Sequence, residues 1–216
     1  MDMAEVRYRA AGGVSLENAN LSGLDLTGFQ MNNLNLAGAN LSNTNLTGVG
    51  LVSADLSGAN LTGATLTGAH FTMSDLSKAD LTGANLVDHD FLAAKMEGTQ
   101  LSGANLSNAS LVRASLRGAN LNGAILLYTD FREADLTGAL LKGANLAGSI
   151  LNEANLTGAD LTGANLAGAE LENTWLFEAS IQGAKFNDTN WEKAFCVRSF
   201  TRCSEHYLES LGAILR

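Results

Sequence analysis

His89 is the residue whose surroundings most suggest catalysis, because Asp88 and Asp90 stand on either side of it. A histidine that bonds a carboxylate is a common general base. Successive side chains of an extended chain point to opposite sides, however, so His89 faces inward and both aspartates face outward. The three residues therefore do not form a relay, and we interpret His89 as a buried histidine that bonds a backbone group.

The other candidates for chemistry lack partners of the right kind. His70 and His206 are isolated, and Cys196 and Cys203 have no further pair of metal ligands near them. The glycines recur with a five-residue period and so do not form a phosphate-binding loop. We predict that the chain is not an enzyme and uses no metal or cofactor. The two cysteines are either free thiols or a terminal disulfide.

A set of aspartates recurs at one repeat position that is shared with asparagine. A side chain that bonds the local backbone explains this sharing better than acid–base catalysis does. The set comprises Asp25, Asp55, Asp75, Asp80, Asp90, Asp130, Asp135 and Asp160.

These residues are positioned by a five-residue repeat over residues 14–193. Every fifth residue from Leu16 to Trp191, 36 positions in all, is large and apolar, and we call it the centre of its pentad. A small residue stands two positions before the centre, and this spacing puts both side chains on the inner face of an extended segment. Two positions after the centre lie 19 of the 23 glycines. That position is predicted to be a turn with positive φ, as in a type II turn.

The recurring phrase Ala-Asn-Leu-Thr-Gly resembles the pentapeptide-repeat family over about five-sixths of the chain. The resemblance implies an all-β fold, a right-handed quadrilateral β-helix with four pentads per coil and about nine coils at a spacing of ~4.8 Å. On that model Phe71, Phe91 and Phe131 share one interior column. We assign residues 1–13 to an N-terminal capping helix, 14–193 to the β-helix and 194–216 to a C-terminal cap or dimerisation helix.

Both ends depart from the repeat. A short helix is expected over residues 2–11, stopped by Gly12 and Gly13, and it is similar to the lead-in of cyanobacterial members of the family. Large side chains replace small ones in the first coil and are expected to pack under this helix, namely Val14, Leu24, Phe29 and Leu34. A second helix is expected after Ser204. Its apolar stripe consists of Tyr207, Leu208, Leu211, Ile214 and Leu215.

The formal net charge of −9 argues against direct binding of nucleic acid, which needs a basic surface. A basic protein, or a protein that itself binds DNA, stays open as a partner. The sequence has no apolar run long enough to span a membrane, and its first residues do not resemble a signal peptide, so we expect a cytoplasmic protein.

Large apolar residues interrupt the mostly small and polar outward positions on two adjoining sides of the four-sided model. They are either a protein-binding surface or sequence variation on a tolerant surface. The candidate partner surface consists of Met73, Leu92, Val112, Ile125, Leu127, Tyr128 and Ile150. Trp175 and Phe177 form a second exposed set near the C-terminal end.

We predict a non-enzymatic interaction scaffold, a rigid acidic rod that presents a flat side to a protein partner. The alternative comes from the resemblance. Some pentapeptide-repeat proteins are DNA-mimicking acidic dimers that protect DNA gyrase and topoisomerase IV from quinolones or other poisons. The segment 207–215 is similar to their dimerising tail, which implies a homodimer. The unbroken, leucine-rich repeat lacks the loops of several such proteins, so their loop-borne activity does not carry over.

Overall fold

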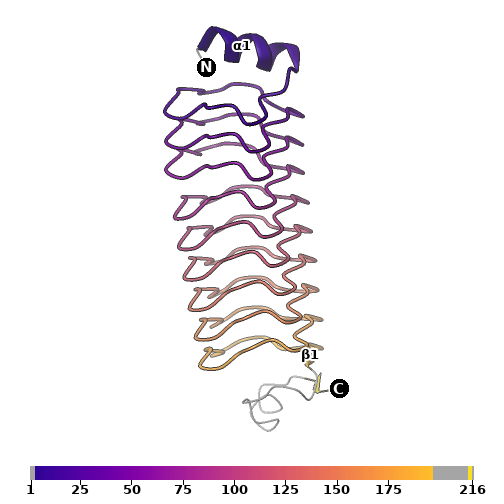
Figure 1. Cartoon of the computed structure of the whole chain (residues 1–216). Coiled ribbons are helices and arrows are strands. Elements are labelled where there is room, and N and C mark those ends of the chain that lie inside the picture. The colour runs from indigo at the N-terminus through magenta and orange to yellow at the C-terminus, as the bar shows by residue number, and fades with distance from the viewer. Residues whose placement is uncertain (1–2, 197–213, 216) are drawn as a thin grey trace.

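The computed structural model describes residues 3–196 and 214–215, and the chain forms a rod of stacked coils (Figure 1). Helix α1 (Met3–Gly12) lies across one end of the rod. Strand β1 (Phe195–Cys196) leaves the other end and pairs in parallel with β2 (Ile214–Leu215). Within the described residues, no helix is long and apolar enough to cross a membrane.

The helix expected after Ser204 is not found where it can be checked. Tyr207, Leu208 and Leu211 lie outside the described residues. Ile214 and Leu215 belong to strand β2, so the expected helix does not include them. Pairing with β1 gives the backbone of these two residues partners in another strand, whereas a helix would pair them within their own segment.

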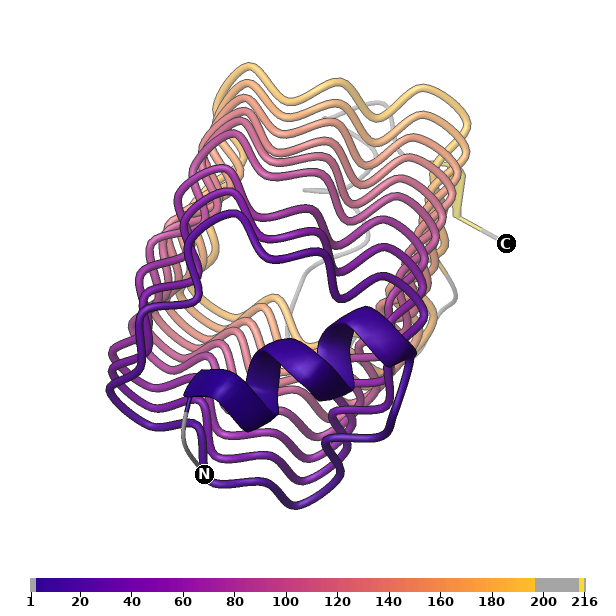
Figure 2. The same cartoon turned by 90° about the horizontal axis from the view of Figure 1, so that it is seen from above.

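The coils repeat every 20 residues. Parallel bridges join residue pairs of this spacing, from Asn20↔Asn40 to Glu170↔Asn190. Each pentad supplies one bridging residue, the one before its centre, so four pentads complete a coil. Figure 2 shows the resulting four-sided outline with α1 across its end. The bridging residues stand singly between turns, which is why the sides of the rod contain almost no extended strand.

The corners of the coil impose a left-handed backbone on every pentad. The residue two positions after each centre has a positive φ, from 53° at Ala93 to 70° at Gly183. The predicted role of glycine is therefore confirmed, but asparagine, lysine, methionine and tyrosine occupy the same position elsewhere. An L-residue in this conformation costs roughly 1–2 kcal/mol relative to the right-handed one. The coil geometry, and not the residue type, sets the conformation of the corner.

The predicted core is confirmed along the whole repeat. All 36 centres are buried, none with more than 4% of its surface exposed. Phe71 and Phe91 stack with ring centroids 5.2 Å apart, as expected for neighbours in one interior column. A buried leucine side chain contributes about 1.5–3 kcal/mol before the entropy of ordering is subtracted, so one per pentad can hold the rod together.

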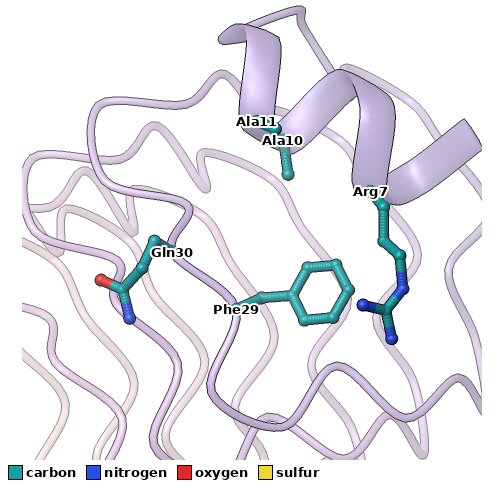
Figure 3. Close-up of a pocket in the computed structure, with 5 residues that line it drawn as sticks. All are labelled: Arg7, Ala10, Ala11, Phe29 and Gln30. Atoms are coloured by element: carbon teal, nitrogen blue, oxygen red, sulfur yellow. The ribbon is translucent and has the colours of Figure 1, made fainter.

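Helix α1 caps the first coil, and its Val6 is fully buried. The Arg7 guanidinium carbon lies 5.2 Å from the centroid of the Phe29 ring, and Figure 3 shows both at the edge of a shallow pocket under the helix. Leu24 and Phe29 are half-buried against the core, as expected of a cap. Val14 is exposed instead, because the chain leaves the helix there and its N–H is tied to the carbonyl of Arg9 at 2.8 Å.

Candidate interaction surface

The recurring aspartates are structural. In each of the eight, Oδ1 accepts a hydrogen bond from the backbone N–H two residues later. The bond from Thr27 lowers the pKa of Asp25, and the bond from Thr162 does the same for Asp160. The hydrogen bond that all eight carboxylates accept from the local backbone confirms their interpretation as turn-forming residues.

His89 is buried, with 7% of its surface exposed, and bonds backbone as predicted. Its Nε2 lies 2.7 Å from the carbonyl oxygen of Leu66, and its Nδ1 lies 2.9 Å from that of Val87. Neither ring nitrogen is paired with a carboxylate. Among the described residues, no group of three or more His, Cys, Asp or Glu side chains could hold a metal ion.

The candidate partner surface falls into two apolar groups. The first is a short row of Met73, Leu92 and Val112 on successive coils. The N–H of Met73 donates to Leu92 O, and that of Ala93 donates to Val112 O, both at 2.9 Å, so these positions are stacked neighbours. Met73 and Leu92 are exposed and Val112 is half-buried. The row runs along one corner of the rod, because Met73 itself is a corner residue.

The second group belongs to a single pentad and consists of Ile125, Leu127 and Tyr128. Ile125 and Tyr128 are exposed, and Leu127 is half-buried. Tyr128 is a corner residue with φ +55°, and its ring lies over Gly148 on the next coil. A Cβ at Gly148 would come within 2.6 Å of two ring atoms, so glycine leaves the space that the tyrosine ring occupies.

Two ion pairs lie close to the apolar groups in the chain, since Arg113 follows Val112 and Asp130 is two residues after Tyr128. Arg113 donates to both carboxylate oxygens of Glu133, at 2.8 and 3.0 Å, and Arg132 pairs with Asp130 at 2.6 Å. The hydrogen bonds from Arg113 hold the pKa of Glu133 below its usual value, and Arg132 adds a smaller effect of the same sign. Ile150, the last residue of the candidate surface, is half-buried and bridges Asp130 and Glu170 on the neighbouring coils.

A family model described as "Pentapeptide repeats" matches residues 15–51, 50–88, 99–138, 139–176 and 154–190. The chain belongs to the pentapeptide-repeat family. Pentapeptide-repeat proteins fold as right-handed quadrilateral β-helices, and the four-sided coil with its 20-residue register agrees with that fold. The family assignment accounts for the core and the corners of the rod, and leaves the exposed apolar residues unexplained.

Two solved pentapeptide-repeat structures are similar over most of their length. HetL, from the cyanobacterium Nostoc sp. strain PCC 7120 and involved in heterocyst differentiation regulation, is 32% identical; the match covers 90% of this chain and 96% of HetL, with a TM-score of 0.46. Trypsin-treated QnrB1, a plasmid-mediated fluoroquinolone resistance protein, is 22% identical over 90% of this chain and 97% of its own, with a TM-score of 0.66. The likeness to QnrB1 shows the shared fold. A search of curated protein sequences found no match.

The pentapeptide-repeat rod also exposes an apolar residue that the sequence reasoning missed. Leu140 is 42% exposed and bridges Asn120 and Asp160 on the neighbouring coils. The signal was present, since Leu140 occupies the position that asparagine and aspartate hold in most pentads. Trp175 and Phe177, by contrast, were expected near the C-terminal end, and their rings contact each other edge to face at 5.8 Å.

Proposed function

We propose that this pentapeptide-repeat protein is a non-enzymatic scaffold that holds a protein partner against the two apolar groups of its candidate partner surface. One observation carries the proposal. Met73 and Tyr128 are 55% and 67% exposed, and both stand at corners with positive φ, 56° and 55°, where glycine is the unstrained residue. Met73 and Tyr128 are thus large side chains that face solvent from a backbone conformation that is unfavourable for any residue but glycine.

Both residues stay more than half exposed, so burial within the fold offsets little of their backbone strain. A glycine at either corner would relieve about 1 kcal/mol of strain, and burial of an exposed side chain contributes little to folding. Strained residues that the fold itself does not require are a pointer to function. A partner that covers Met73 and Tyr128 would bury both side chains and account for their presence.

The chemistry of the surface fits a protein with a basic rim. The neighbouring part of the rod carries Glu133, Glu153, Glu170 and Glu172, of which Glu133 is paired with Arg113 and Glu172 with Lys193. The whole chain has a net charge of −9. Complementary charge speeds association and selects partners, while the apolar groups supply most of the affinity. The proposed partner is therefore a protein and not a nucleic acid or a membrane, and the proposed location is the cytoplasm.

The test compares partner capture with stability. The double variant Met73→Gly, Tyr128→Gly should lose partners captured by the wild-type rod from a lysate of its host and identified by mass spectrometry. Its thermal unfolding midpoint should be unchanged or higher, because both glycines relieve strain. The matched control is Asn108→Gly, which changes a polar corner of the Tyr128 column and should keep the partners. Unchanged capture by the double variant would refute the proposal.

A second candidate is protection of DNA gyrase or topoisomerase IV by a DNA-mimicking homodimer. The acidic charge favours it, and the rod is continuous between its ends. In this case the β-helix of residues 14–193, a right-handed quadrilateral of about nine coils at a spacing of ~4.8 Å, is joined to a second copy through residues 194–216. Supercoiling by gyrase with and without a fluoroquinolone, together with light scattering, tests it. A monomer with no effect on the assay would remove this candidate.

A further inference from the structure

The hydrogen-bond ladder of the rod is interrupted once between Asn20 and Asn190. Bridges of 20-residue spacing run along the stack, but Thr65 does not bridge to Asn85, nor His70 to Asp90. The N–H groups of Leu66, Gly68 and Phe71 also lack the backbone bonds to the next coil that their counterparts make. We call the contact between residues 63–71 on one coil and residues 82–90 on the next coil the split interface. In Figure 1 the purple coils draw apart at this level.

A regular interface two coils later shows what is missing. There the N–H of Leu106 donates to Ile125 O at 2.8 Å, that of Asn108 to Leu127 O at 2.9 Å, and that of Leu111 to Asp130 O at 2.7 Å. We call the contact between residues 103–111 on one coil and residues 122–130 on the next coil the closed interface. The two interfaces are built from the same pentad pattern, so a specific side chain must separate the coils in the split one.

That side chain is His89. It occupies the inward position that Ala109 and Thr129 occupy on later coils of the same column. An imidazole is larger than either side chain, and its ring lies 6.1 Å from the Phe71 ring and 6.2 Å from the Phe91 ring. Beside it is a cleft of about 450 Å³ that is lined by residues 67–70 and 87–90. His89 therefore acts as a wedge between two coils.

The two bonds of the wedge require two protons. Both ring nitrogens face carbonyl oxygens, Nε2 that of Leu66 and Nδ1 that of Val87. A neutral imidazole has one N–H, so one of its nitrogens would direct a lone pair at a carbonyl oxygen. The imidazolium donates through both nitrogens. The nearby phenyl faces also favour a cation. The observed geometry thus matches the charged ring.

Three other titratable groups line the cleft. Asp88 and Asp90 belong to the same coil as His89, and His70 belongs to the preceding coil. Asp90 is also tied to the preceding coil by a bond from Thr72 Oγ1, at 3.3 Å. The following coil carries no charged residue between Leu101 and Val112.

We propose that His89 is a proton-operated wedge in the wall of the rod. The doubly protonated ring donates through Nε2 to Leu66 O on the preceding coil and through Nδ1 to Val87 O on its own coil. Only the bond to Leu66 joins the two coils, so loss of the Nε2 proton removes its donor and weakens the local hold between them. The contribution of this bond to stability is present while Nε2 carries its proton and is lost when that proton leaves.

The test uses the full chain and reads the ring and the backbone separately. Nitrogen NMR of the His89 ring should show both nitrogens protonated at acid pH. Protection of the Leu66, Val87 and Leu106 amides against hydrogen exchange, corrected for intrinsic rate, should fall with rising pH at the first two and stay constant at the third. His89→Thr should abolish this pH dependence, and should slow exchange at Leu66, Gly68 and Phe71 roughly tenfold or more as their ladder bonds form.

His70→Gln is the matched control, because it removes the other histidine of the cleft and keeps the wedge. It should leave the pH dependence of amide protection at Leu66 and Val87 in place. Two results would overturn the proposal. One is a His89 ring that holds a single neutral tautomer from pH 5 to 8. The other is wild-type protection at Leu66, Gly68 and Phe71 equal to that at Leu106, Asn108 and Leu111, which would mean that no split exists.

Discussion

Thr129 and His89 stand in the same interior column, and each bonds the carbonyl of the leucine 23 residues before it. Thr129 Oγ1 donates to Leu106 O at 2.8 Å, and the ladder around it is complete. His89 makes the equivalent contact to Leu66, and the ladder around it is broken. The two residues make the same contact and differ in volume, so we attribute the broken ladder at His89 to the size of its ring.

Buried leucines should differ most between the two interfaces. Leu106→Ala removes a fully buried side chain from the closed interface and should lower the free energy of unfolding by about 4 kcal/mol. Leu66→Ala should cost about 1 kcal/mol less, because the space it leaves adjoins an existing cleft that admits water. Urea unfolding of the two variants checks this. Equal losses would indicate that the split interface is packed as tightly as the closed one.

Thr129→His should convert the closed interface into a second split one. Loss of several ladder bonds, at about 1 kcal/mol each after exchange with water, should lower the free energy of unfolding by about 3 kcal/mol. Hydrogen exchange should quicken at Leu106, Asn108 and Leu111. The Leu36 amide, which donates to Asp55 O at 2.7 Å on distant coils, serves as the internal control. An intact ladder in this variant would show that histidine fits the column without separating the coils.

Thr129→Val keeps the volume of the side chain and removes only its hydroxyl. The bond to Leu106 O is lost, but this oxygen still accepts from the Ala109 N–H at 2.9 Å. The expected loss is therefore about 1 kcal/mol, with the ladder unchanged. Chemical denaturation measures the loss in free energy of unfolding, and amide exchange shows whether the ladder is unchanged. A broken ladder in this variant would mean that the hydroxyl of Thr129, and not the volume of its side chain, keeps the ladder complete.

The smallest effect is expected for the ion pair between Arg113 and Glu133, which joins the same two coils as the closed interface. Hydrogen bonding from Arg113 lowers the pKa of Glu133, so the pair stabilises the fold above the ordinary glutamate range and is lost as the pH falls through the lowered value. In Arg113→Gln the pKa of Glu133 should rise toward its ordinary value in an NMR titration. Asp160, whose partner is Thr162, should titrate as before.

The regular part of the molecule follows from the pattern alone. A large apolar residue at every fifth position predicts one buried side chain per pentad, and every centre is buried. The recurring aspartates were correctly interpreted as turn-forming residues, since their place before the centre recurs with asparagine. His89 was correctly predicted to be inward and bonded to backbone. These successes share a cause, because the spacing of two between inward residues depends only on the geometry of an extended chain.

Other features depended on neighbours 20 residues away. The sequence placed His89 inside, but a ring that separates two coils is recognisable only when the adjoining Phe71 and Phe91 are in position. Likewise, Tyr128 fits its corner because Gly148 lies beneath it on the next coil. The expected helix after Ser204 was assigned from an apolar stripe, and the stripe could not show that Ile214 and Leu215 pair with β1 instead.

The sequence by itself determined the period, the inside and the corners of this rod, because these follow from local backbone geometry repeated along the chain. Only the tertiary structure decided between which coils the hydrogen-bond ladder is complete. It also decided what space a large corner residue finds, as Tyr128 does over Gly148 on the next coil. Both depend on contacts between residues one coil apart, where the volume of one side chain is matched against the space left by another.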